Sequence, residues 1–169
     1  MFHITSGRKS RLDRAVVLCT LLLLLCSFAL PAGATPPQEL NFTTNVTYNV
    51  MQGPPSVSGT WTATGLISSS GDAWIDHFNA GWNDAGLWLR NSHTTEVYTD
   101  DQGTITLEAH ITNISGSNPL SGDGRWVIKS GTGAYADLHG VGTVSIYGEM
   151  TTFPNLIVTA TYSGVGHFD

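Results

Sequence analysis

The segment Arg125–Val144, RWVIKSGTGAYADLHGVGTV, constrains the fold more than any other part of the chain. An alternating strand pattern runs into two glycines, a short turn of small residues, two more glycines and a second strand pattern. Glycine tolerates positive φ and close backbone approach, and such positions bend a strand. We therefore predict a corner where a curved sheet turns back on itself, with Gly131, Gly133, Gly140 and Gly142 as structural residues.

Side-chain character alternates with period two along most of the remaining chain, which indicates strands with one buried and one wet face. The pattern predicts strands at about 41–51, 58–68, 73–78, 86–90, 93–99, 104–113, 124–130, 141–150 and 155–167. The segment 75–89 mixes two strands with a loop and is the least clear. No helix longer than one turn is expected, and 134–138 is the best position for that turn.

Eight or nine antiparallel strands in one small domain must either close or fold into two layers. The glycine corner favours closure, because bending a strand around a barrel needs bulges and glycine kinks. The sequence therefore predicts an all-β protein, a closed antiparallel eight-stranded barrel with negligible helix.

The first 34 residues predict an export signal rather than part of the fold. Basic residues precede an apolar run, Ala15–Leu30, and Ala32-Gly33-Ala34 supplies a small-residue cleavage site. We expect cleavage after Ala34, a flexible Pro-rich lead at 35–40, a single barrel domain at 41–169 and a secreted protein. Both cysteines, Cys19 and Cys26, would leave with the signal, so no disulfide or thiolate metal ligand is expected.

Charge narrows the range of partners. After residue 34 the chain has three basic and twelve acidic residues, a formal charge of −9 with histidines neutral. Nucleic acid and anionic membranes are disfavoured, because the basic patch that they require is missing. Sequons begin at Asn41, Asn45 and Asn113 and matter only in a host that glycosylates. In a chain this rich in Thr, Ser and Asn, chance is the favoured explanation for them.

Four segments carry a family resemblance: SGTWTATG (58–65), GTITL (103–107), RWVIKSGTGAYADLHGVGT (125–143) and YSGVGHFD (162–169). They resemble small exported bacterial proteins similar to the allene oxide cyclase-like barrel superfamily, which includes dirigent proteins and spiroketal-forming cyclases. Its mark, G-[TS]-G-x-[FY]-x-x-x-x-G after a strand, is matched at every position of Gly131–Gly140. The resemblance implies a barrel whose lumen can hold a small apolar molecule, with Tyr135 closing the barrel end or packing beneath the corner. It also implies a possible homo-oligomer (a trimer), and it transfers no catalytic residue.

Aromatic side chains are the candidates for lining such a lumen. They are Trp61, Trp74, Trp126, Tyr48 and Tyr162. The weak candidate for acid–base chemistry is Asp76, which shares a strand face with Trp74 and Phe78. An inward Asp76 would sit among aromatics and have a raised pKa; an outward Asp76 is an ordinary surface acid.

Other chemistries lack support. Gly131–Ala136 imitates a dinucleotide fingerprint, but Gly140 and Gly142 end any helix after one turn, so no βαβ unit exists and no cofactor is expected. The histidines show no metal-ligand spacing, no metal is predicted, and no G-x-S-x-G elbow occurs. A carboxylate pair for glycoside hydrolysis stays open, because acids on different strands can face each other.

The resemblance, together with the lack of a recognisable catalytic motif, leads to three hypotheses for the function. The leading hypothesis is a secreted barrel that binds a small apolar or amphipathic ligand in its lumen. The second is an isomerase or cyclase of the allene oxide cyclase or spirocyclase type, acting by confinement of its substrate. The third is a structural or surface-interaction domain whose interior is filled by Trp61, Trp126, Ile105 and Leu107. Strand number does not separate them, since eight strands allow either a filled interior or one small ligand.

Overall fold

The computed structural model describes residues 35–49, 52, 57–82, 89–112, 114–115 and 118–169. The predicted signal peptide, the sequon at Asn113 and the strand start predicted at 86–88 lie outside the described residues. The described residues form eight strands and one short 3₁₀-helix: β1 (Gln38–Asn49), β2 (Ser58–Gly65), β3 (Ser69–Trp82), β4 (Leu89–Thr99), β5 (Thr104–Ile111), β6 (Leu120–Gly131), η1 (Gly133–Tyr135), β7 (Leu138–Thr152) and β8 (Asn155–Phe168).

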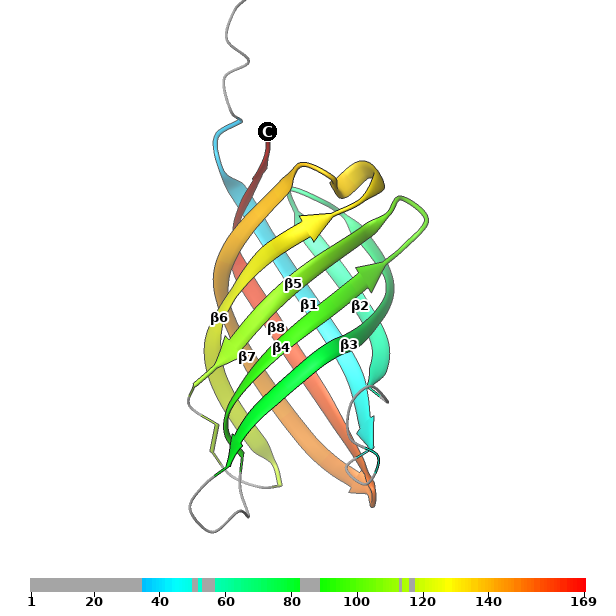
Figure 1. Cartoon of the computed structure of the whole chain (residues 1–169), viewed down its shortest axis with the longest axis vertical. Coiled ribbons are helices and arrows are strands. Elements are labelled where there is room, and N and C mark those ends of the chain that lie inside the picture. Colours follow the sequence, from blue (N-terminus) through cyan, green and yellow to red (C-terminus); the bar gives the residue numbers. More distant parts are fainter. Residues whose placement is uncertain (1–34, 50–51, 53–56, 83–88, 113, 116–117) are drawn as a thin grey trace, which may run out of the picture. The chain divides into compact units, whose positions relative to one another are not determined.

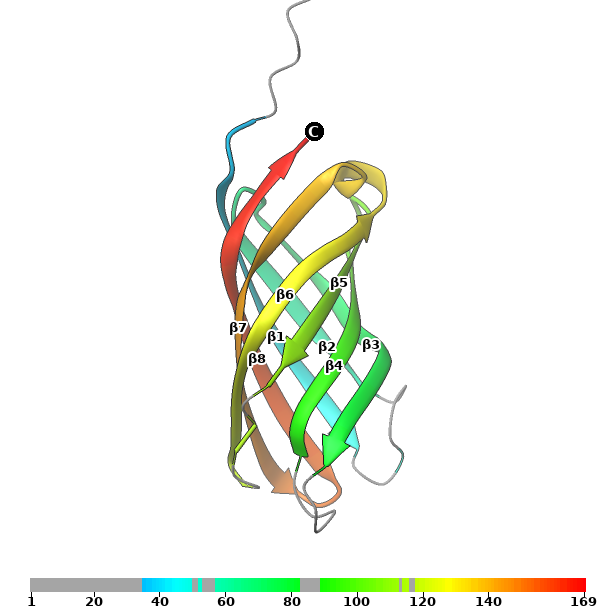
Figure 2. The same cartoon turned by 60° about the vertical axis from the view of Figure 1, so that its left-hand side comes forward.

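The strands form a closed antiparallel barrel in which each strand pairs with its neighbour in sequence and β1 pairs with β8 (Figures 1 and 2). Closure leaves no free sheet edge. The predicted fold class is thereby confirmed. We call the end that carries η1 and the β4–β5 turn the corner end, and the end that carries the β7–β8 turn the far end; these lie at the top and bottom of Figure 1.

Several strand boundaries differ from the sequence prediction. Residues 38–40, expected in a flexible lead, belong to β1, and Leu40 is fully buried. The predicted strands at 86–90 and 93–99 are represented by the single strand β4, which starts at Leu89. In both places the alternation of polar and apolar residues is weak. Residues 38–40 are held in β1 by pairing with β8, and the start of β4 is held by pairing with β3.

The glycine corner joins β6 to β7 through η1. Gly133 has a φ of +60°, a left-handed conformation, and a Cβ there would lie 2.1 Å from the Gln102 carbonyl oxygen. Tyr135 is buried beneath the corner, and its hydroxyl donates to Asp100 Oδ2 at 2.5 Å. Asp100 also accepts hydrogen bonds from the Ser69 hydroxyl and from the backbone N–H groups of Gln102 and Gly103. The Asp100 carboxylate thus links the β2–β3, β4–β5 and β6–β7 connections at the corner end.

Replacing Tyr135 with phenylalanine should lower the free energy of unfolding by about 1.5–3 kcal/mol, the usual cost of losing a hydrogen bond to a charged group.

Desolvation acts to raise the pKa of Asp100, but the hydrogen bonds from Ser69, Tyr135 and the backbone outweigh it and lower this pKa. The contribution of Asp100 is therefore complete above about pH 3.9, the unfolded value, and is lost as the pH falls through the lowered folded pKa. Urea unfolding at pH 7 measures the decrease in unfolding free energy of the Tyr135→Phe variant. Tyr147→Phe is the control, because Tyr147 is half exposed on β7; an equal loss in both variants would contradict the role of Asp100.

Candidate functional site

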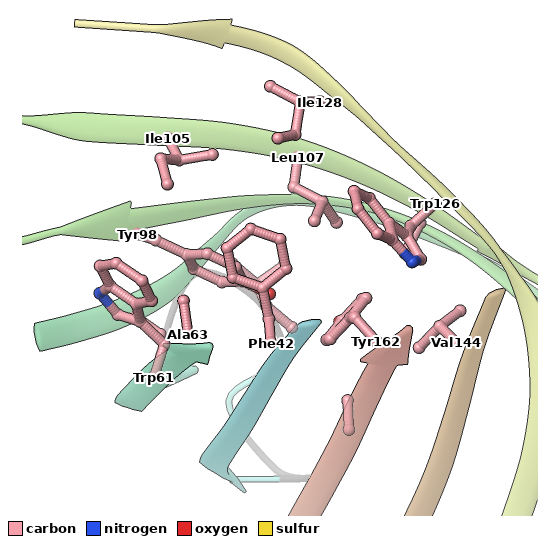
Figure 3. Packing of buried hydrophobic residues seen from close by; sticks show 14 of the residues in the cluster. Phe42, Trp61, Ala63, Tyr98, Ile105, Leu107, Trp126, Ile128, Val144 and Tyr162 are labelled. Carbon is pink, nitrogen blue, oxygen red and sulfur yellow. The ribbon is translucent and has the colours of Figure 1, made fainter. Parts of the chain in front are cut away.

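Aromatic side chains fill the corner half of the barrel. Phe42 is central: its ring centroid lies 5.6 Å from that of Tyr98 and 5.6 Å from that of Trp126 (Figure 3). Trp61 stacks on Tyr98 with centroids 5.4 Å apart, and Tyr162 lies edge-on to Trp126 at 6.3 Å. All five rings are buried, together with Ile105 and Leu107. The four side chains expected to fill the interior under the structural hypothesis therefore do so in this half.

Glycines on β7 and β8 make room for the indole of Trp126. Gly140, Gly142 and Gly164 lie beneath it, and a Cβ at each would come within 3.2 Å of an indole atom. Gly142 and Gly164 face each other across the two strands. Glycines of the corner motif thus serve packing of a large ring as well as the bend itself.

A polar cluster interrupts this apolar interior at Glu96 on β4. Glu96 Oε1 accepts hydrogen bonds from the Tyr162 hydroxyl at 2.7 Å and the Thr94 hydroxyl at 3.0 Å, and Oε2 accepts one from the Tyr98 hydroxyl at 2.9 Å. The Thr44 side chain interacts with the Tyr162 hydroxyl from β1. The cluster therefore links β4 to β8 and β1 through the inside of the barrel.

Burial raises the pKa of the Glu96 carboxyl, and the hydrogen bonds from Tyr162, Tyr98 and Thr94 offset only part of this effect. Burial and the nearby charge of Glu96 also hold the pKa values of Tyr98 and Tyr162 well above that of free tyrosine. Both phenols accordingly keep their protons. Glu96 is a carboxyl group that can hold its proton at a higher pH than a surface glutamate.

Glu96 has no basic partner among the described residues. Arg90, Arg125 and Lys129 are all exposed, and Lys129 Nζ lies 3.2 Å from Glu108 Oε2 on the outside of the barrel. Glu96 is also the one buried acid in the described part of the chain. A buried carboxyl without a counter-charge is costly to ionise, and such groups concentrate at functional sites.

Beyond this cluster, toward the far end, inward-facing side chains retain exposure. On β1, β7 and β8 the buried residues Val46, Val144 and Ala160 are each followed, two positions nearer the far end, by a half-buried one. These half-buried residues are Tyr48, Ile146 and Val158. Because side chains two apart share a face, the three point into the barrel. Val57, Ser92 and Ile111 are buried at the same end, so the far half is less completely filled along β1, β7 and β8 rather than all around the barrel.

Four of the five predicted lumen residues lie inside the barrel, whereas the fifth, Trp74, and the acid–base candidate Asp76 do not. Trp61, Trp126 and Tyr162 are buried together in the corner half, and Tyr48 packs against Phe78 in the far half with centroids 6.0 Å apart. Trp74 and Asp76, in contrast, lie on the exposed outer surface of β3.

A β-bulge explains why Trp74 and Phe78 do not share a face as their spacing predicts. The pairing of β3 with β4 shifts between Ile75 and His77, so Asp76 is an extra residue without a partner in the register. Ile75 on one side of the bulge and Phe78 on the other both pack into the core. A bulge of this kind reverses the alternation beyond it.

Sequence reasoning did not single out Glu96, although a signal was present. The turn signal at 101–103 and the apolar face of β5 together set the hairpin register, which pairs Tyr98 with Ile105 and Glu96 with Leu107. Since Ile105 and Leu107 face inward, Glu96 must as well. The signal was easy to miss because Ser92, Thr94 and Glu96 make the inner face of β4 as polar as its outer face.

Comparison of the chain with protein-family models, with curated proteins and with solved structures gives no match. The likeness to allene oxide cyclase-like barrels thus stays a prediction from the sequence. Within the described residues, no helix is long and apolar enough to span a membrane. Nor does any group of three His, Cys, Asp or Glu side chains in that part of the chain form a metal site.

Proposed function

We propose that the protein is a secreted barrel that binds a small amphipathic ligand in the far half of its lumen. The observation that carries this proposal is the convergence of three hydroxyl groups on the buried, unpaired carboxyl of Glu96. A site of this kind combines apolar walls with a few placed polar groups, as small-molecule sites do. Thr94, Glu96 and their partners would hold the polar end of the ligand.

The half-buried inward residues supply the apolar part of this site. Tyr48, Phe78, Ile146 and Val158 come from β1, β3, β7 and β8, and a ligand that covered them would remove apolar surface from water. The filled corner half acts as the floor, since Phe42 and Tyr98 close the barrel there. The ligand would enter from the far end.

Filling the far half with a larger side chain tests the proposal. Val158 points inward and Ile157, its neighbour on β8, is exposed on the outside. We expect Val158→Trp to weaken binding of a neutral polarity-sensitive dye at least tenfold, and Ile157→Trp to leave it unchanged. Fluorescence titration measures both affinities, and circular dichroism checks the fold. Equal affinity in the two variants, or no dye binding by the wild-type protein, would contradict binding in the lumen.

An isomerase or cyclase acting by confinement is the second candidate. It is favoured by the raised pKa of Glu96, since a buried carboxyl that keeps its proton can act as a general acid. Glu96, rather than the exposed Asp76, would then be the buried acid for acid–base chemistry. If a substrate is identified, Glu96→Gln should abolish turnover, whereas Asp76→Asn should not.

A further inference from the structure

We propose that the polar end of the ligand is a cation, so that the lumen takes an amphipathic amine or quaternary ammonium compound. This inference rests on the proposed function and adds the chemical class of its ligand. It follows from three properties of the Glu96 cluster. No basic side chain pairs with the carboxyl in the described part of the chain, one carboxyl oxygen can accept a further hydrogen bond, and aromatic rings surround the group.

The first property is the absence of an internal counter-charge in the described part of the chain. Every described Arg and Lys side chain is exposed. Burial disfavours the ionised form of Glu96. A ligand cation beside the carboxyl would supply the missing positive charge and favour that ionised form, because this attraction is far stronger in a low-dielectric interior than in water. A ligand carboxylate would supply no compensating charge and would oppose the ionisation of Glu96, so anions such as fatty acids should bind most weakly.

The second property is the hydrogen bonding of the carboxyl oxygens. Oε1 accepts two hydrogen bonds, from Tyr162 and Thr94, whereas Oε2 accepts one, from Tyr98. An ionised carboxylate offers about four acceptor positions, so one remains on Oε2. The N–H of an amine would fill that position, and a quaternary ammonium group would satisfy the charge without it.

The third property is the aromatic surroundings. Tyr98 and Tyr162, whose hydroxyls donate to Glu96, have ring centroids 6.4 Å apart and planes inclined by 74°. Phe42 and Trp126 lie against them. Because the Tyr98 and Tyr162 hydroxyls donate to Glu96, the edges of these rings are directed at the carboxyl. The rings therefore supply an apolar, low-dielectric wall beside the acid, in which the attraction between a cation and the carboxylate is strengthened. The charge of −9 after residue 34 adds a long-range attraction for the same class.

Three ligands with the same ten-carbon chain test the inference: decyltrimethylammonium, decanol and decanoate. We expect the wild-type protein to bind the ammonium compound at least tenfold more tightly than decanol, and decanoate most weakly, by calorimetry below the micelle concentrations. Glu96→Gln should remove the preference for the ammonium compound over decanol. The matched control is Glu108→Gln, because Glu108 lies on the outside and pairs with Lys129.

Two outcomes would overturn the inference in different ways. If decanol binds as tightly as the ammonium compound, or decanoate binds more tightly, the inference fails and the proposed lumen site stands. If none of the three binds, the proposed function fails with it. The wild-type ranking decides between these outcomes even if Glu96→Gln does not fold.

Discussion

Replacing Trp126 with alanine should destabilise the barrel by about 3–5 kcal/mol, the usual cost of removing a large aromatic side chain from a core. Trp126 is 3% exposed and fits over glycines of β7 and β8, so its loss leaves a cavity that rigid backbone cannot close. The midpoint of thermal unfolding should fall by on the order of 10–20 °C. Calorimetry or thermal circular dichroism measures the change.

Trp74→Ala is the matched control, because Trp74 is 37% exposed on the outside of β3. The same chemical change there should cost about 1 kcal/mol or less. Comparable losses in the two variants would show that Trp74 and Trp126 occupy similar environments, and would contradict the inward and outward faces assigned to them.

Glu96→Gln should change how stability depends on pH. Because burial raises the pKa of Glu96, the folded state keeps a proton that the unfolded state releases above about pH 4.3. Wild-type stability should therefore fall as the pH rises from that value through the raised folded pKa, by up to about 1.4 kcal/mol per pH unit for this one proton. Glutamine keeps the shape and has no proton to lose, so the variant should lack this fall.

Urea unfolding between pH 4 and pH 8 measures the difference between wild-type and variant. Glu108→Gln serves as the control, since Glu108 is partly exposed and pairs with Lys129 on the surface. If the unfolding free energy of the wild-type protein changes with pH in parallel with that of Glu96→Gln across this range, Glu96 is not buried as described. This measurement needs no ligand, so it tests the site independently of the proposed function.

Much of the fold could be predicted from the sequence because local patterns dictate it. The alternation in β1, β2, β5 and β8 places Phe42, Trp61, Ile105 and Tyr162 on the buried face. The glycines near Tyr135 predict the bend between β6 and β7. In these segments, strand propensity, turn residues and packing all favour the same structure.

The pattern of residues 75–82 did not predict their structure, because that structure depends on pairing with β4 rather than on their own sequence. The bulge at Asp76 appears only when β3 is aligned with β4, and it reverses which face Phe78 presents. A sequence with period two gives no sign of one extra residue. The outward position of Trp74 and the inward position of Phe78 follow from that single irregularity.

The candidate site could not be predicted from the sequence pattern for a related reason. Glu96 lies in a strand whose two faces are both polar, so alternation alone does not separate the inside from the outside. Its partners Tyr98 and Tyr162 are 64 residues apart in the chain and meet only when the barrel closes. The hairpin register of β4 and β5 would have placed the carboxyl inside, but only closure brings Tyr162 to it.

Native mass spectrometry of the protein purified from its own host tests binding in the lumen most directly. We predict one small molecule bound per barrel, retained by Ile157→Trp and lost from Val158→Trp. A wild-type protein that carries no bound molecule, and gains none when small amphipathic compounds are added, would show instead that the interior is filled by its own side chains.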